Sequence, residues 1–267
     1  MMASTEEGRG GDPRLAWRIL PDLLALLSGL AIAWFMDWET RDLVWSLWLC
    51  SLVIGYVSIL TALGAGGYFG MALIGHPGFK AEHRVKAIIS GAVGGVFLLG
   101  FFSLHFCGFH AGHSVFLHHF FPIEGMPQDG FGEAFMNPPL LWVLVFRHLM
   151  VPFGIFLVPA LIAERKQVFG PWGVTVRKVR EIRADAEGVN PALGSQEGRE
   201  AASKDLMGNA MARPYINVVR MHLLIFFFAI AYALKVDDFL VYAVVYFLYF
   251  TPWRELQRVW DKRREQT

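Results

Sequence analysis

Stretches of about 20 apolar residues recur along this chain and limit what it can fold into. A helix of that length rises roughly 30 Å, which is the thickness of the hydrocarbon layer of a bilayer. Hydrophobic residues make up 55% of the 267 residues, and aromatic residues make up 15%, which is unusual for a soluble domain. The sequence therefore predicts an all-α fold, a polytopic membrane helical bundle surrounded by lipid.

Six segments are predicted to cross the membrane. The first is longer than the core of a signal peptide and has no small-residue cleavage signal after it, so we interpret it as a retained span. The predicted spans are residues 15–35, 43–63, 85–121, 139–163, 215–235 and 239–250.

Lys and Arg gather in alternate connecting segments. The segment between spans three and four holds Glu124, Asp129 and Glu133 and no cation, whereas both tails and the second and fourth loops are basic. Because cytoplasmic loops carry the excess of Lys and Arg, both termini are predicted to be cytoplasmic. The predicted organisation is a cytoplasmic tail at 1–14, transmembrane helices 1–4 at 15–163 with a histidine-rich segment at 105–119, a cytoplasmic basic loop at 164–213, transmembrane helices 5 and 6 at 214–252, and a cytoplasmic tail at 253–267.

The third predicted span, residues 85–121, is too long for one crossing and cannot be two. Two crossings would place the acidic loop and the basic loop on the same side of the membrane. We therefore expect one crossing that continues beyond the outer surface, or that bends at Gly108 or Gly112. Its histidine-rich part then lies at the non-cytoplasmic end.

That part reads LHFCGFHAGHSVFLHHFFP and holds five of the nine histidines of the chain. His110 and His113 are three residues apart and share one face of a helix. His105 and His113 are eight residues apart, which separates them by about 12 Å along the axis and about 80° in direction. One metal ion cannot bind both on a straight helix, so a bend, two ions or a larger cofactor would be needed.

Two further predicted spans carry ionisable residues at depth. His148 follows Arg147 in the fourth span, and His222 lies two residues after Arg220 in the fifth. Such residues are expensive inside a membrane and mark functional sites by default. An anionic small molecule or a lipid headgroup would suit Arg147 and Arg220 as ligand-binding residues.

The predicted spans contain several histidines and few carboxylates, which narrows the choice of a cofactor for this site. The predicted spans have almost no internal Asp or Glu, which argues against a carboxylate-bridged di-iron centre. Imidazole ligands suit an iron, copper or zinc ion, or the axial positions of haem. The leading hypothesis is a membrane-bound, metal-dependent oxidoreductase acting on a lipid-soluble substrate. Its candidate metal ligands are His105, His110, His113, His148 and His222.

Two other functions remain open. A transporter or channel could relay protons or ions through the intramembrane His and Arg, and a membrane scaffold could use its histidines structurally. The spacings Gly66-x-x-x-Gly70 and Gly91-x-x-x-Gly95 are typical of close helix contacts, within the chain or in an oligomer.

Composition excludes other classes. The formal net charge of +1 gives no electrostatic basis for binding nucleic acid. Cys50 and Cys107 both fall in apolar segments, which indicates buried thiols and no disulfide framework.

The combination of HFCGFHAGHSVF and VVRMHLLIFF resembles the bacterial multi-pass membrane proteins of domain of unknown function 6498. In that family a histidine close to an aromatic residue and a glycine is followed by a second histidine eight residues later, and a later span carries another. His105, Phe109, His113 and Phe116 match the first pattern and His222 the second, while His110 is an addition. The resemblance implies the bacterial inner membrane and a shared histidine site, and it implies no known activity.

Overall fold

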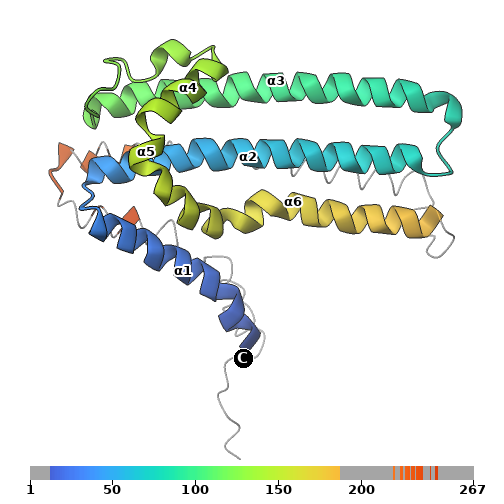
Figure 1. Ribbon diagram of the computed structural model, residues 1–267, viewed down its shortest axis with the longest axis horizontal. Coiled ribbons are helices and arrows are strands. Elements are labelled where there is room, and N and C mark those ends of the chain that lie inside the picture. Colours follow the sequence, from blue (N-terminus) through green and yellow to red (C-terminus); the bar gives the residue numbers. More distant parts are fainter. Residues whose placement is uncertain are drawn as a thin grey trace, which may run out of the picture.

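The computed structural model describes residues 13–186 continuously and, after them, only isolated positions between 219 and 245. Every regular element in this part of the chain is a helix, which confirms the all-α prediction. The elements in chain order are α1 (Pro13–Phe35), α2 (Thr40–Gly75), α3 (Ala81–Phe120), η1 (Gly132–Ala134), α4 (Pro138–His148), α5 (Met150–Phe153), η2 (Gly154–Phe156) and α6 (Leu157–Ala186) (Figure 1).

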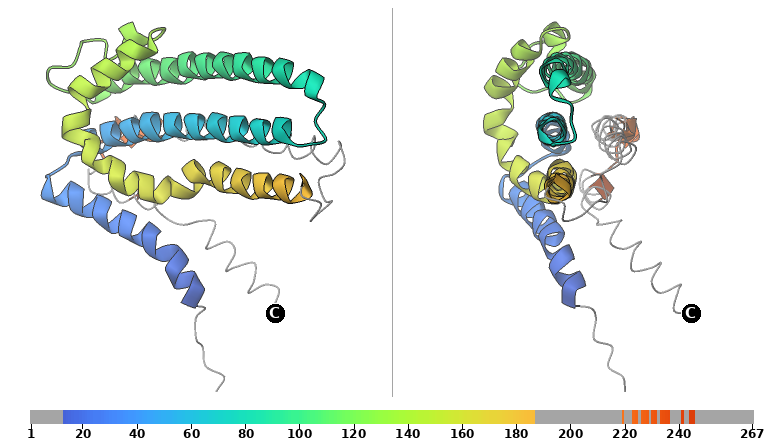
Figure 2. Two further views of the ribbon diagram at one scale, coloured as in Figure 1. Left: turned by 45° about the vertical axis from the view of Figure 1, so that its right-hand side comes forward. Right: turned by 90° about the vertical axis from the view of Figure 1, so that its right-hand side faces the viewer.

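Three long helices lie side by side in the order α3, α2, α6 (Figure 1). Seen end-on, they form a row, with α4, α5 and η2 crossing one side of it (Figure 2). In the most apolar window of α2, 78% of the residues are buried, whereas only 6% are buried in that of α3. α2 is therefore the central helix, and α3 exposes most of its apolar surface.

Two helices, α2 and α3, are long and apolar enough to cross a membrane. A third span results if α4 and the helix that follows it count as one, although the chain bends by 63° between them. The predicted first span has a shorter apolar helix at Ile19–Phe35. The described residues thus support a membrane protein with two or three such helices, and the predicted fifth and sixth spans lie outside them.

The predicted fourth span is not one helix. A proline ring clashes with the carbonyl four residues earlier, and α4 ends at His148, four residues before Pro152. At the start of α4, the Asn137 side chain accepts a hydrogen bond from the Leu140 amide, and prolines occupy the first helical positions. The chain therefore turns sharply at residues 149–156, within the segment 139–163 that the sequence predicts as one continuous span.

Helix α6 extends through the first part of the predicted cytoplasmic loop. Val179 and Ile182 are buried against Phe69 of α2, and the Thr61 hydroxyl donates to the Val168 carbonyl oxygen at 3.0 Å. The first part of the segment predicted as a loop is therefore the second half of α6. Helix α6 packs against α2 and continues through residue 163 without a break.

Helix α3 is continuous through Gly108 and Gly112. Its 40 residues rise about 60 Å, roughly twice the thickness of the hydrocarbon layer. A Cβ atom at Gly108 would lie 2.9 Å from the Phe135 carbonyl oxygen. Gly108 therefore lets the segment 121–137, called the outer loop after its predicted side of the membrane, approach the helix closely, and no helix break occurs there.

Ion pairing connects α1 to α6. The Asp22 carboxylate accepts a hydrogen bond from the Arg165 guanidinium, and its second oxygen lies 3.8 Å from Lys166 Nζ. Asp22 is buried. The only carboxylate well inside the first predicted span is therefore neutralised by two cations of α6.

Gly55 of α2 packs against the ring of Phe106 in α3. A Cβ atom at this position would lie 2.3 Å from Phe106 Cζ, so Gly55→Ala must displace that ring. We expect a loss of about 1–3 kcal/mol in unfolding free energy, because overpacked cores lose that amount. Chaotrope unfolding in mild detergent, followed by far-UV circular dichroism, measures it.

Gly67→Ala is the matched control on the same helix. A Cβ atom there meets nothing within 4 Å, and alanine favours a helix over glycine by about 0.5–1 kcal/mol. We expect this variant to be at least as stable as the parent. Equal losses in the two variants would contradict the contact between Gly55 and Phe106.

Candidate functional site

The histidine-rich segment centres on His110, which is fully buried in α3. Its Nδ1 lies 2.9 Å from the Phe106 carbonyl oxygen, and its Nε2 lies 3.1 Å from Ser51 Oγ in α2. Because a carbonyl oxygen only accepts, Nδ1 carries the proton, and in a neutral ring Nε2 accepts from the Ser51 hydroxyl. This assignment follows from the hydrogen-bond network. His110 is thereby a polar link between α2 and α3.

Aromatic rings enclose this link. The His110 ring lies 4.4 Å from that of Phe106 and 5.6 Å from that of Trp48, measured between ring centroids. Trp48 in turn contacts Phe131 of the outer loop at 5.7 Å. The arrangement satisfies the buried imidazole by hydrogen bonding and packing.

His105 and His113 lie on a column of rings along α3. Successive members are four residues apart, so they share one face of the helix. The column consists of Phe97, Phe101, His105, Phe109 and His113. His105 is exposed and stacks on Phe101 with ring centroids 5.4 Å apart, while His113 is half-buried and its ring lies 6.1 Å from that of His110.

The structure therefore brings together His110 and His113 and leaves His105 on the outer face of the helix. His148 of α4 is half-buried, with its ring 6.2 Å from that of Phe131. Within residues 13–186 and the described positions that follow, no group of three or more His, Cys, Asp or Glu residues is placed to hold a metal ion. His222 lies outside the described residues, so the complete metal site stays a prediction.

Of the two predicted ligand-binding arginines, the structure describes one. Arg147 is exposed at the end of α4 and forms no ion pair with a described residue. Arg220 lies outside the described part of the chain. Cys50 and Cys107 are free and buried, which confirms the prediction made for them.

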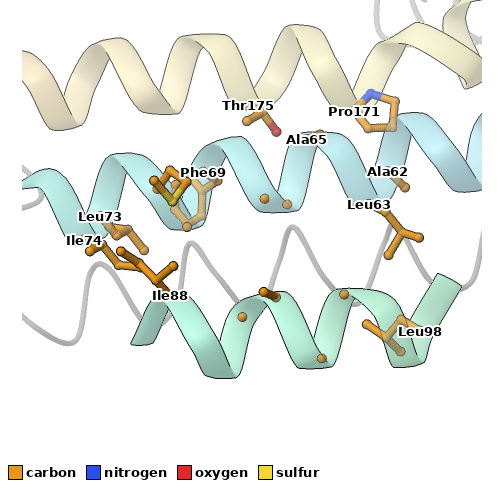
Figure 3. Close-up of a pocket in the computed structure, with 18 of the residues that line it drawn as sticks. Ala62, Leu63, Ala65, Phe69, Leu73, Ile74, Ile88, Leu98, Pro171 and Thr175 are labelled. Carbon is orange, nitrogen blue, oxygen red and sulfur yellow. The ribbon is translucent and has the colours of Figure 1, made fainter. Parts of the chain in front are cut away.

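A second candidate site lies away from the histidines. A cavity of about 600 Å³ lies between α2, α3 and the middle of α6 (Figure 3). Figure 3 shows Leu63 and Leu98 at one end of it, and Leu73, Ile74 and Ile88 at the other. Its walls are apolar side chains and glycines from residues 59–74 and 87–102, completed by Pro171 and Thr175.

The glycine spacings do not bring α2 and α3 into close contact in the described residues, and contact with a second copy of the chain stays a prediction. Six glycines line the cavity, and a Cβ atom added at any of them would have no neighbour within 4 Å. Larger side chains stand at the two ends of the cavity, with Leu63 and Leu98 at one end and Ile74 and Ile88 at the other (Figure 3). The stretch of α2 and α3 between these ends contains the glycines. The glycines concerned are Gly66, Gly67, Gly70, Gly91, Gly94 and Gly95.

Thr175 is the only residue with a polar side chain among those described around the cavity. The residue is 0% exposed, and its Oγ1 atom has no hydrogen-bond partner. In Figure 3 its oxygen points from α6 toward α2. A buried hydroxyl without a partner costs about 1–3 kcal/mol, so its presence here requires an explanation.

A smaller, more polar pocket adjoins the cavity. It measures about 300 Å³, shares Met71 with the larger cavity, and includes His76 and Arg183. The Arg183 guanidinium donates to the Tyr68 hydroxyl at 3.4 Å. His76 and Arg183 thus give this pocket a basic character that the larger cavity lacks among its described residues.

The fold defines an all-helical protein with two or three helices able to cross a membrane and an apolar cavity between them. Residues 14–165 match the model of the Family of unknown function (DUF6498), and the chain belongs to that family. This confirms the family predicted from the histidine motif. Comparisons with curated proteins and with solved structures found no match.

Sequence reasoning missed the residues that make the cavity. Glycines four residues apart predict that two helices pack closely at that point. Here the same glycines line a cavity between α2 and α3, and the spacing alone does not distinguish the two cases. Ser51 and Thr175 gave no signal, because single hydroxyl residues in apolar helices are common. Thr175 also lies beyond the predicted fourth span, in a region interpreted as a loop.

Proposed function

We propose that this protein is an integral membrane protein that binds a lipid-soluble molecule between α2, α3 and α6. The observation that carries the proposal is the apolar cavity of about 600 Å³. Small-molecule sites have volumes of about 300–1,000 Å³ and are lined mainly by apolar groups with a few polar ones. The volume and the lining of the cavity both fall in that class.

The apolar outer surface of α3 supports a membrane position for the cavity. Helix α3 forms one wall, and its apolar side chains are largely exposed on the opposite face, including Val93 and Val96. Since lipid tails are as apolar as the cavity, burial of apolar surface alone does not favour a bound molecule over a lipid tail. The shape of the cavity and its single hydroxyl group then determine which molecule is retained.

For the topology, we propose six membrane spans with both termini in the cytoplasm, and a location in a bacterial inner membrane. The alternation of basic and cation-poor loops supports this arrangement, as does the length of α2 and α3. The family of the chain is consistent with it.

The predicted redox chemistry at a histidine-bound metal or haem stays a prediction. Its lipid-soluble substrate would be the molecule that binds in the cavity. The proximity of the His110 and His113 rings favours it, whereas the hydrogen bonds of His110 assign that residue a structural role. Transport of ions and a structural scaffold are the remaining predicted functions. Neither requires an apolar cavity of this size.

Photolabelling tests the binding proposal. The protein is reconstituted into liposomes and labelled with a long-chain hydrocarbon that carries a diazirine, and labelled peptides are identified by mass spectrometry. We expect labels on residues 59–74 and 87–102. Gly95→Leu fills the cavity, where nothing lies within 4 Å of the added Cβ atom, and should reduce this labelling at least five-fold.

Gly100→Leu is the matched control. Gly100 is on the same helix and is equally open to an added Cβ atom, but it does not line the cavity. Labelling of the cavity residues should be unchanged in this variant. Labelling that follows the general exposure of α3 and responds equally to the two substitutions would overturn the proposal, since it would report contact with bulk lipid.

A further inference from the structure

Building on the proposed function, we infer that the Thr175 hydroxyl donates a hydrogen bond to the bound molecule. The site then selects a lipid-soluble carbonyl compound, such as a ketone, a quinone or an ester, over a plain hydrocarbon. A ligand could occupy the cavity without bonding to Thr175. In that case the inference would be wrong and the proposed function would stand.

The first observation is that Thr175 differs from the other hydroxyl residues of these helices. A serine or threonine in a helix usually donates back to a carbonyl three or four residues earlier. Ser58 donates to the Ile54 carbonyl oxygen at 2.8 Å, and Ser28 donates to that of Ala25 at 3.1 Å. Ser46, Ser103 and Ser114 behave in the same way.

Thr175 makes no such bond, although it is 0% exposed. The hydroxyl belongs to a helix that packs along α2, and the described residues around it are apolar. A donor left buried in this way loses the hydrogen bond that water would give it. A ligand atom in the cavity would restore that bond.

The second observation is that the described lining of the cavity contains one polar side chain, that of Thr175. A carbonyl oxygen has no proton to donate and is satisfied by a single donor. A ligand hydroxyl also carries a donor, and an ammonium carries three donors and a charge, so these groups would be left without partners. A carboxylate would bring an uncompensated charge into apolar surroundings. One carbonyl flanked by apolar groups is the chemistry that one threonine can satisfy.

Competition between two matched compounds tests the inference. Dibenzyl ketone and 1,3-diphenylpropane differ only in that a carbonyl replaces a methylene group. Each is added to the full-length protein in liposomes, and its ability to block the diazirine label on the cavity residues is measured. Because each compound is compared with itself across variants, its partition into the bilayer cancels.

Thr175→Val removes the hydroxyl and keeps the shape of the side chain. We expect dibenzyl ketone to compete about five-fold less well with this variant, as the loss of one net hydrogen bond predicts. Competition by 1,3-diphenylpropane should be unchanged. Thr175→Ser keeps the hydroxyl and should retain the preference for the ketone.

The outcomes separate the two proposals. If Thr175→Val weakens both compounds equally, or neither, the hydroxyl does not bind the ligand, while the effect of Gly95→Leu on labelling can still support the cavity. If neither compound competes and the cavity residues are not labelled in any variant, both proposals are overturned.

Discussion

Gly130→Ala is expected to lower the free energy of unfolding by about 3 kcal/mol, one of the largest effects of any single methyl group in the described residues. Gly130 has φ +56°, a conformation that costs a residue with a Cβ atom about 1–2 kcal/mol. The added methyl group would also lie 2.7 Å from the Ser114 carbonyl oxygen and 2.8 Å from its carbon. Backbone atoms of a helix cannot move aside as a flexible side chain can.

The reason for this sensitivity is the position of the outer loop. The Phe131 amide, next to Gly130, donates to Ser114 Oγ of α3 at 2.8 Å. The Phe131 ring is fully buried against Trp45 and Trp48 of α2. A displaced Gly130 therefore withdraws this ring from the core and exposes the surroundings of His110.

Gly125→Ala is the control for Gly130→Ala. Gly125 also has a positive φ, +76°, but nothing lies within 4 Å of an added Cβ atom. In Gly125→Ala only the cost of a positive φ for alanine applies, so the unfolding free energy should fall by about 1–2 kcal/mol. Chaotrope unfolding in mild detergent measures both variants, and losses of the same size would contradict the described packing of the loop on α3.

His110→Ala is expected to have a comparable effect, about 3 kcal/mol. The substitution removes a buried ring packed between Phe106 and Trp48 and leaves the Ser51 hydroxyl without its partner. His119→Ala removes an exposed histidine of the same segment and should change stability by less than about 0.5 kcal/mol. Unfolding in detergent compares the two variants.

The same pair of variants separates a structural from a metal-binding histidine. If His110 is structural, the loss of stability persists after treatment with a chelator, and the metal content of the two variants is equal. If His110 is a metal ligand, bound metal falls in His110→Ala alone and chelation of the parent protein reproduces the loss. Metal analysis and the visible absorption spectrum, read beside the unfolding data, decide between them.

The sequence predicted the helical class and the first three helices from the length of their apolar runs. α2 extends to Gly75, beyond the predicted end near residue 63, because the glycine-rich run stays helical beside α6. The fourth predicted span failed as a single helix. Pro152 lies among apolar residues that satisfy a hydropathy window, and the window does not register the missing amide that ends α4 at His148.

The candidate site was predictable only in part. Clustering identified His110 and His113, whose rings are neighbours, but it could not show that Ser51, 59 residues earlier, would bond the first of them. The spacing Gly91-x-x-x-Gly95 is typical of a close contact between helices, whereas in the structure these glycines line the cavity between α2 and α3. Helix separation depends on residues such as Leu63 and Leu98 on two helices at once, which no local pattern encodes.

Native mass spectrometry of the protein released from mild detergent tests the central claim most directly, because it detects any molecule that the cavity retains. The account predicts one added mass of a lipid-soluble molecule on the parent protein and on Gly100→Leu, and its absence from Gly95→Leu. A parent protein that carries no such mass, or a mass that persists unchanged in Gly95→Leu, would contradict a ligand site between α2, α3 and α6.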